Sequence, residues 1–158
     1  MLRAGEELAM RAALDEAAQA ALAGEVPVGA VVMRDGAIIV RTQNRMRRDG
    51  DATAHAELLA LREAMRVLGE ARLTGCTLVI TLEPCAMCAG AIVLSRVDRV
   101  VFGAWDDKAG MAGSVGDLLR HAKLNHRPEV EGGVHEPLAA AQLQEFFASR
   151  REIGRAHV

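Results

Sequence analysis

The stretch of sequence that decides the fold is residues 81–90, Thr-Leu-Glu-Pro-Cys-Ala-Met-Cys-Ala-Gly. It completes an aliphatic run over 77–82 that is typical of a buried strand, and Pro84 favours the first position of a helix. Cys85 and Cys88 are three positions apart, so their side chains face the same way on a helix. The stretch is therefore predicted to be a strand-to-helix turn that brings two thiols together.

Helices and strands alternate on both sides of this turn. Apolar spacing and turn residues predict five helices, over 6–23, 53–68 (with Thr53 as the cap), 84–95, 117–123 and 138–150. The same signals predict strands over 28–33, 37–40, 77–82 and 99–102, and a further strand near Val130. An Asp-Gly turn joins the first two strands in a hairpin. This order predicts an α/β fold, with helices on both faces of a sheet and the hairpin at one edge.

Composition indicates one globular domain with an aliphatic core. The chain has 158 residues, 51% of them hydrophobic and 25% charged, but only three Phe, one Trp and no Tyr. The formal charge of −2 neither requires nor excludes a nucleic-acid partner. We expect one domain over 1–158, with its core over about 6–151 and a frayed tail over 153–158.

Targeting signals and disulfides are not indicated. The longest apolar run, Ala86–Leu94, is far shorter than the ~18 residues that span a bilayer. Glu6 and Glu7 precede any long apolar stretch, which argues against a secretory signal. Three cysteines are too few for a disulfide framework, so we expect a cytoplasmic protein without a membrane partner, in which Cys85 and Cys88 serve metal or redox chemistry.

Three candidate metal ligands stand at the starts of two predicted helices. His55 opens one, and Cys85 and Cys88 open the other. One imidazole and two thiolates suit Zn²⁺, and helix N-termini favour thiolates. Three protein ligands leave the fourth position of the ion open, as a catalytic zinc site requires. The sequence therefore predicts one zinc ion held by these three side chains.

Glu57 is the candidate catalytic residue because it lies two positions from His55 without being needed as a ligand. Zinc lowers the pKa of a bound water to about 7, and a neighbouring carboxylate can take up the proton and deliver it to the group under attack. Taken alone, the Cys pair fits a redox dithiol and His55 fits a capping or core residue. Cys76 fits a small buried apolar residue, with a third thiolate ligand as the alternative. Together, the two motifs match the H-x-E…P-C-x-x-C signature of zinc deaminases.

The wider match consists of short segments along the chain. They are Glu25-Val-Pro-Val-Gly-Ala30, Asn44-Arg45, Thr53-Ala-His-Ala-Glu57, the 81–90 stretch, Arg99-Val-Val-Phe-Gly-Ala104, Asp106-x-Lys108-x-Gly110 and Leu124-Asn-His-Arg127. From about Arg11 to Arg151 the chain resembles the bacterial tRNA-specific adenosine deaminases of the cytidine deaminase-like superfamily. The resemblance implies a three-layer α/β/α fold with a mixed five-stranded sheet, one Zn²⁺ per subunit and a homodimer.

The implied reaction is hydrolytic deamination of the wobble adenosine to inosine in the anticodon of tRNA(Arg), with Glu57 as the proton shuttle. The resemblance also assigns a base pocket formed by Asn44, Ala56, Val28 and Leu82. Asp106 is expected to meet the flanking nucleotides, where a ribose 2′-hydroxyl distinguishes RNA from DNA. A solvated loop acid is the alternative for Asp106.

The target adenosine must leave the stack of the anticodon stem-loop to reach such a zinc. Basic side chains are candidates for holding the RNA backbone, with a solvated basic face as the alternative. The candidates are Arg45, Arg47, Arg48, Lys108, Arg150 and Arg151. Trp105, Gln43 and Ala52 depart from the family pattern, and Trp105 either stacks on a flanking base or covers an apolar seam.

Two other functions remain open at this point. A zinc deaminase of a free nucleobase, nucleoside or nucleotide, of the guanine or cytosine type, would use the same metal chemistry. A zinc-stabilised RNA-binding module would use the metal without catalysis, and Glu57 would then be dispensable.

Overall fold

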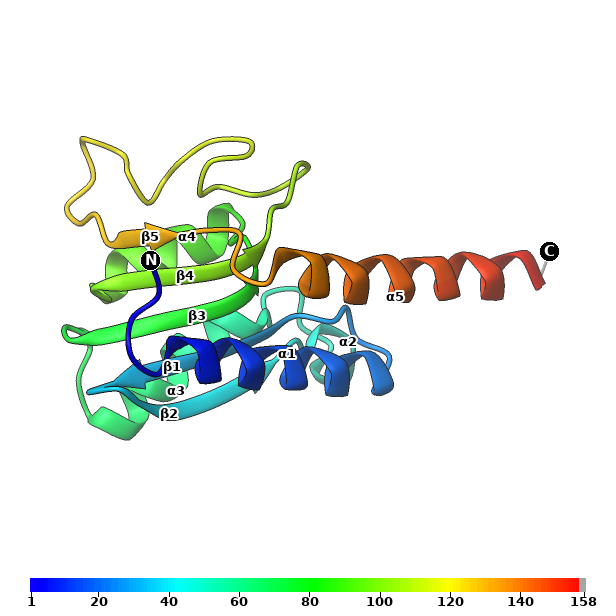
Figure 1. The fold of residues 1–158 in the computed structure, drawn as a ribbon, viewed down its shortest axis with the longest axis horizontal. Helices are drawn as coiled ribbons and strands as arrows, with labels where there is room; N and C mark the ends of the chain where they lie inside the picture. Colours follow the sequence, from blue (N-terminus) through cyan, green and yellow to red (C-terminus); the bar gives the residue numbers. More distant parts are fainter. Residues whose placement is uncertain (157–158) are drawn as a thin grey trace.

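The computed structural model describes residues 1–156 and shows an α/β protein with a five-stranded sheet (Figure 1). The strands are β1 (Gly29–Arg34), β2 (Ala37–Gln43), β3 (Cys76–Leu82), β4 (Arg99–Ala104) and β5 (Glu129–Glu131). Their order in the sheet is β2-β1-β3-β4-β5. β1 pairs antiparallel with β2 and β3, whereas β3, β4 and β5 run parallel. The mixed sheet with its hairpin at one edge is confirmed.

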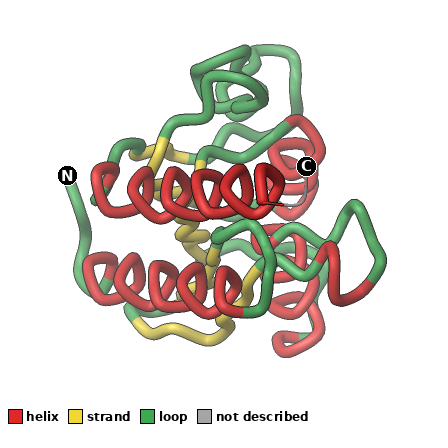
Figure 2. The backbone as a smooth tube through the Cα atoms, turned by 90° about the vertical axis from the view of Figure 1, so that its right-hand side faces the viewer, coloured by secondary structure: helices red, strands yellow, loops and turns green. Residues whose placement is uncertain are grey.

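Helices cover both faces of this sheet (Figures 1 and 2). α1 (Glu6–Leu22) and α5 (Glu136–Ala156) lie side by side on one face, where α1 packs against β1, β2 and β3 and α5 packs against β4 and β3. α3 (Ala56–Leu68) and α4 (Ala86–Ser95) enclose the second core on the other face. The three-layer α/β/α fold is therefore confirmed. The core is aliphatic, and Phe102 is its largest fully buried side chain.

A glycine sets how closely α1 approaches the sheet. A β-carbon at Gly29 would lie 1.9 Å from the carbonyl oxygen of Ala13 and 2.8 Å from the backbone nitrogen of Ala17. Both are backbone atoms in the middle of α1, so no side-chain rotation could make room. The hydroxyl of Thr81 accepts the N–H of Gly29 at 3.2 Å, and this bond fixes the start of β1 beside the end of β3.

One buried ion pair links α1 to β4. Arg99 donates from Nε to Glu6 at 2.7 Å and from its Nη2 at 2.9 Å, and both side chains are almost fully buried. Burial raises the pKa of Glu6, but hydrogen bonds from Arg99 and from the Arg3 backbone outweigh this effect and lower the pKa overall. The pair therefore remains ionised inside the packing between helix and sheet.

Several predicted element boundaries were wrong. The segment 117–123 forms turns rather than a helix, because Leu119 is drawn into the core and Ala112 forms a bridge with Asp117. The one-turn helix α2 (Met46–Asp49) was not predicted. His55, not Thr53, caps α3, and α4 begins at Ala86 after its N-cap Cys85, so Pro84 lies before the helix.

The closing helix is longer than predicted. α5 continues to Ala156 instead of ending near Arg150, so the tail expected to fray from 153 is helical that far. Residues 157–158 of that predicted tail lie outside the described residues. No helix within residues 1–156 combines the length and hydropathy needed to cross a bilayer.

Candidate active site

The three predicted zinc ligands meet at the starts of α3 and α4. His55 is the N-cap of α3, Cys85 is the N-cap of α4, and Cys88 lies in the first turn of α4. Nδ1 of His55 is 3.7 Å from Sγ of Cys85 and 3.5 Å from Sγ of Cys88. All three donor atoms lie within 4.8 Å of one another. The structure therefore brings together the imidazole and both thiols.

This spacing fits a tetrahedral zinc ion. Zn–N distances of ~2.0–2.1 Å and Zn–S distances of ~2.3 Å at tetrahedral angles separate nitrogen from sulfur by about 3.5 Å. The observed separations of 3.5 and 3.7 Å match that value. One nitrogen and two sulfurs are also a donor set typical of zinc, with one coordination position left open.

The site favours ionisation of one thiol. Hydrogen bonds from Cys88 and His55 lower the pKa of Cys85 to about 3, against the opposing effect of burial. The position of Cys85 at the start of α4 acts in the same direction, because the unpaired N–H groups there favour negative charge. The pKa of Cys88 is raised by its hydrogen bond to Cys85 and by burial. A cation at this position would favour the thiolate forms of both.

Glu57 lies beside the three donors on the first turn of α3. Its side chain is buried, and this burial raises the pKa of the carboxyl to about 7. His55 lowers that pKa through its charge, while Cys85 raises it. A carboxyl that titrates near neutrality can both accept and donate a proton, which is the property that general acid/base catalysis requires.

A pocket of about 170 Å³ opens onto this cluster. Four of the predicted substrate-binding residues line it, namely Val28, Asn44, Leu82 and Asp106. His55, Glu57 and Cys85 of the predicted catalytic centre line it as well. The other lining residues were not indicated as pocket residues by the sequence: they are Val26, Met46, Glu83 and Ala109. All of these residues lie at or just beyond one end of the sheet. At this end β2, β3 and β4 finish and β1 begins.

Asn44 holds the pocket together through its side-chain amide. Its Oδ1 accepts the N–H of Ala56 at 2.8 Å, and its Nδ2 donates to the carbonyl of Val26 at 3.2 Å. Ala56, whose backbone was predicted to line the pocket, is fully buried and is not among the residues that line it. Its carbonyl accepts the hydroxyl of Thr42 at 2.7 Å.

Asp106 begins the loop that forms the opposite wall. Its carboxylate accepts the backbone N–H groups of Lys108 at 3.1 Å and Ala109 at 3.2 Å. Its own backbone N–H donates to the carboxylate of Glu83 at 2.9 Å. The side chain is partly exposed, so Asp106 lies at the mouth of the pocket.

Comparison with known proteins shows which family has this site. Residues 4–104 match the cytidine and deoxycytidylate deaminase zinc-binding region. The chain belongs to this deaminase family. It is 47% identical over 151 residues to a tRNA-specific adenosine deaminase of Bacillus subtilis, covering 96% of this chain and 94% of the relative.

Solved structures show the same deaminase fold. A structure from a study of A-to-I editing by tRNA:A34 deaminases superposes with a TM-score of 0.84 at 42% identity, covering 87% of this chain and 99% of that one. A guanine deaminase from Nitrosomonas europaea superposes with a TM-score of 0.80 at 27% identity, covering 94% and 87%. The chain is thus a zinc-dependent hydrolase of the deaminase type, and His55, Cys85 and Cys88 are positioned to hold the metal.

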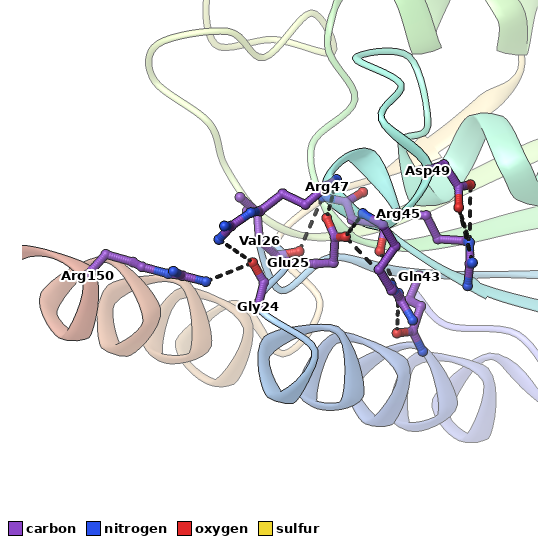
Figure 3. A network of polar contacts seen from close by, with 10 residues as sticks. Gly24, Glu25, Val26, Gln43, Arg45, Arg47, Asp49 and Arg150 are labelled. Atoms are coloured by element: carbon purple, nitrogen blue, oxygen red, sulfur yellow. Dashed lines mark hydrogen bonds and ion pairs between the residues drawn. The ribbon is translucent and has the colours of Figure 1, made fainter. Parts of the chain in front are cut away.

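The predicted basic residues of this deaminase form two groups. In the first group, Arg47 and Arg150 converge on Gly24, while Arg45 lies beside Asp49 (Figure 3). Arg47 and Arg150 both donate to the carbonyl of Gly24, at 3.4 and 2.8 Å. Arg45 pairs with Asp49, and Arg48 donates to Gln43 and to the carbonyl of Asn44.

The second group, Lys108 and Arg151, lines a groove of about 630 Å³ beside the pocket. Val26, Leu82, Asp106 and Ala109 line both cavities, so the groove continues directly from the pocket. Trp105 and Phe147 add exposed aromatic surface to it. Trp105 also packs edge-on against Phe102, with 4.8 Å between the ring centroids.

Sequence reasoning missed two fully buried carboxylates that shape the deaminase pocket. Glu25 accepts the backbone N–H groups of Arg47 and Arg48, at 3.1 and 2.7 Å, and so fixes α2 beside Asn44 (Figure 3). Glu83 binds the loop that follows β4. In the sequence both acids look solvated, because their partners lie more than 20 positions away.

Proposed function

We propose that this deaminase converts adenosine to inosine at the wobble position of the anticodon of tRNA(Arg). The observation that carries the proposal is the buried Glu57 beside the His55, Cys85 and Cys88 donors at a pocket. The relative named as a tRNA-specific adenosine deaminase and the solved tRNA:A34 deaminase structure support the choice of substrate.

Glu57 is the proton shuttle of the proposed reaction. His55, Cys85 and Cys88 would hold the zinc ion, which would supply a water nucleophile near neutral pH. Glu57 accepts the first proton that water gives up and passes it to the purine ring nitrogen. It then takes the proton of the newly added hydroxyl group and delivers it to the leaving amine, and the hydroxyl becomes the carbonyl of inosine. A C–O bond forms and the C–N bond to the amino group breaks, so adenosine and water give inosine and ammonia.

Asn44 and the apolar walls bind and orient the base. The Asn44 amide carries two hydrogens, and only one is needed for the bond to Val26, so the other can donate to the purine. Val28 and Leu82 provide apolar contact on the pocket walls, and the bond from Ala56 fixes the Asn44 amide. The pocket holds one planar base once the surrounding nucleotides have been splayed apart.

The adjoining groove receives the nucleotides next to the flipped adenosine. Trp105 and Phe147 are exposed aromatic rings on which a base can stack, while Lys108 and Arg151 can neutralise phosphates. Asp106 lies where pocket and groove meet, so its carboxylate can accept a hydrogen bond from a ribose 2′-hydroxyl.

The first basic group provides a further RNA-binding surface beside the groove. Its members are Arg45, Arg47, Arg48 and Arg150. Arg47 and Arg150 come from elements far apart in sequence and converge on Gly24, which concentrates positive charge near the pocket (Figure 3). Their contacts with carbonyls do not cancel that charge, so both remain available to phosphates. Arg45 and Arg48 contribute less because each has an acidic neighbour, Asp49 or Glu25.

We further propose that the chain acts in the cytoplasm as a single-domain homodimer with one Zn²⁺ in each subunit. The exposed apolar side chains of Met87 and Leu94 on α4 support the homodimer, because a second subunit would shield them from water. The cysteine usage supports a reducing compartment.

Incubation with a tRNA(Arg) transcript tests the proposed substrate directly. Purified protein should produce inosine at the wobble position, read by sequencing, and should leave a transcript with guanosine there unchanged. Glu57→Gln should retain zinc and lose at least 10²-fold in turnover. Transcript binding without any inosine, equally strong in the wild type and in Glu57→Gln, would support a non-catalytic zinc module instead.

Deamination of a free base is the second candidate, favoured by the structural similarity to the Nitrosomonas europaea guanine deaminase. The same preparation should therefore be assayed with free guanine, cytosine and adenosine. Turnover of one of these compounds without any inosine in the transcript would reject the tRNA proposal and retain the zinc chemistry.

A further inference from the structure

The carboxylate of Glu83 is the centre of a hydrogen-bond network that the proposed reaction does not use. Glu83 follows β3 and is 1% exposed. Its Oε1 accepts the backbone N–H of Asp106 at 2.9 Å, and its Oε2 accepts those of Ala112 and Ser114 at 2.9 and 3.0 Å. The hydroxyl of Ser114 donates to Oε1 as a fourth bond. A single buried side chain thus satisfies donors from both ends of the loop 106–114.

The loop closes around this carboxylate without spare room. A β-carbon at Gly110 would lie 2.3 Å from the carboxyl carbon of Glu83, so only glycine allows the loop to pass this closely. The backbone N–H of Met111 also donates to the carbonyl of Pro84 at 2.8 Å. The loop is therefore attached to the turn that leads into Cys85.

The same loop carries one wall of the substrate-binding surface. Asp106 and Ala109 line the base pocket, and Lys108 lines the adjoining groove. These three residues have few other attachments: the Asp106 carboxylate bonds only within the loop, to Lys108 and Ala109. Their position relative to His55 and Glu57 therefore depends on the contacts at Glu83.

We propose that Glu83 is a positioning residue that holds the 106–114 loop against the pocket and thereby sets substrate affinity, without binding the metal or transferring a proton. This inference rests on the proposed function for its substrate. A loop that is already ordered loses less conformational entropy on binding, so loosening it should raise KM more than it lowers kcat.

Two substitutions disturb the contact between Glu83 and the 106–114 loop, one by changing the carboxylate and the other by changing the loop. Glu83→Gln replaces an acceptor oxygen with an NH₂ group, which then faces backbone N–H donors and cannot bond to them. Gly110→Ala displaces the carboxylate while leaving it chemically intact. Glu70→Gln is the matched control, because it changes an exposed carboxylate that lines neither the pocket nor the groove.

The measurements are zinc content, kcat and KM on the tRNA(Arg) transcript, and hydrogen exchange of the substrate-free zinc protein. Both test variants should keep one zinc per chain, raise KM at least tenfold and change kcat less than threefold. Exchange at the Ala112 and Ser114 amides should accelerate at least tenfold, with β3 and α4 unchanged. The double variant should raise KM no more than the stronger single variant, since both disrupt one contact. Glu70→Gln should match the wild type.

Other results would overturn the proposal. A merely structural role predicts a smaller active fraction, seen as lower kcat with unchanged KM. Loss of zinc would assign Glu83 to the metal site, and unchanged exchange at Ala112 and Ser114 would show that it does not hold the loop. If the wild type leaves tRNA unmodified, the proposed function fails. The role of Glu83 can then still be decided from the hydrogen exchange data and from KM measured on whichever free base the enzyme deaminates.

Discussion

Asn44 Oδ1 lies 2.8 Å from the backbone nitrogen of Ala56, so a side chain of the pocket completes the first turn of the helix that carries Glu57. The N–H groups at the start of a helix have no partner within it, and Ala56 is fully buried away from water. Asn44, which lines the pocket, and the helix that carries Glu57 are therefore parts of one hydrogen-bonded unit.

Removal of this contact should reduce both stability and activity. Asn44→Ala leaves the N–H of Ala56 buried without a partner, which should lower the free energy of unfolding by about 1–3 kcal/mol. Urea unfolding measures this loss, and kcat/KM should fall in the same variant. Arg41→Ala, at an exposed position of the same strand, β2, is the control and should cost less than about 0.5 kcal/mol. Equal stability of the two variants would contradict the role of Asn44.

Metal binding should depend on both thiols of the donor cluster, Cys85 and Cys88. Cys85→Ala or Cys88→Ala should reduce zinc, measured by elemental analysis, to well below one ion per chain and should lower the melting temperature, because metal binding and folding are coupled. A chelator should lower the melting temperature of the wild type in the same way. Cys76→Ala should keep the metal, because Cys76 lies outside the donor cluster. Full zinc occupancy in Cys88→Ala would contradict the assigned ligand set.

The raised pKa of Glu57 should be visible in the stability of the metal-free protein. Burial lifts the pKa from 4.5 to about 7, so the folded state binds this proton more tightly than the unfolded state. The contribution of Glu57 to stability is therefore retained below pH 4.5 and declines as the pH rises to 7.

Glu57→Gln isolates this effect because it has no carboxyl to ionise, while the cysteines titrate in both proteins. Its stability advantage over the wild type should grow by roughly 2–3 kcal/mol between pH 5 and pH 8, measured by urea unfolding with chelator. An advantage that stayed constant with pH would show that Glu57 titrates normally.

The buried ion pair between α1 and β4 should tolerate joint replacement better than the loss of one member. Arg99→Ala leaves Glu6 buried without its partner and should cost about 3–5 kcal/mol. The double variant Glu6→Gln with Arg99→Met should cost clearly less, since no buried charge remains. Thermal unfolding of both variants, with Arg11→Ala as an exposed-pair control, provides the comparison.

Gly29→Ala should be among the most damaging single-methyl additions in the chain. The new β-carbon would overlap the backbone of α1 at Ala13, so the helix would have to move away from the sheet. We expect a loss of at least about 3 kcal/mol in the free energy of unfolding. Gly90→Ala adds the same methyl group on a helix with open space and should stabilise by up to about 1 kcal/mol.

The sheet and long helices were predictable because their apolar residues repeat with regular spacing. The run 77–82 is buried through most of its length, and residues 6–22 form α1 as predicted. Short elements lack such a signal. α2 has four residues, and 117–123 has apolar residues that enter the core from turns instead of from a helical face.

The metal cluster was predictable because zinc ligands follow fixed spacings along the chain, and the structure places His55, Cys85 and Cys88 together. The roles of Glu25 and Glu83 were not, because a buried carboxylate is defined by donors from distant segments. The position of Glu83 directly after a buried strand and before Pro84 was the only local hint.

The donor cluster lies at the starts of two helices. The 106–114 loop, which forms one wall of the pocket, is held mainly by its hydrogen bonds to Glu83. The donor cluster and this one wall of the pocket are therefore carried by separate parts of the chain. Selectivity could be redesigned by exchanging this single segment, provided that the transplant keeps a glycine at position 110 and amide donors toward Glu83, while the hydrolytic apparatus stays intact.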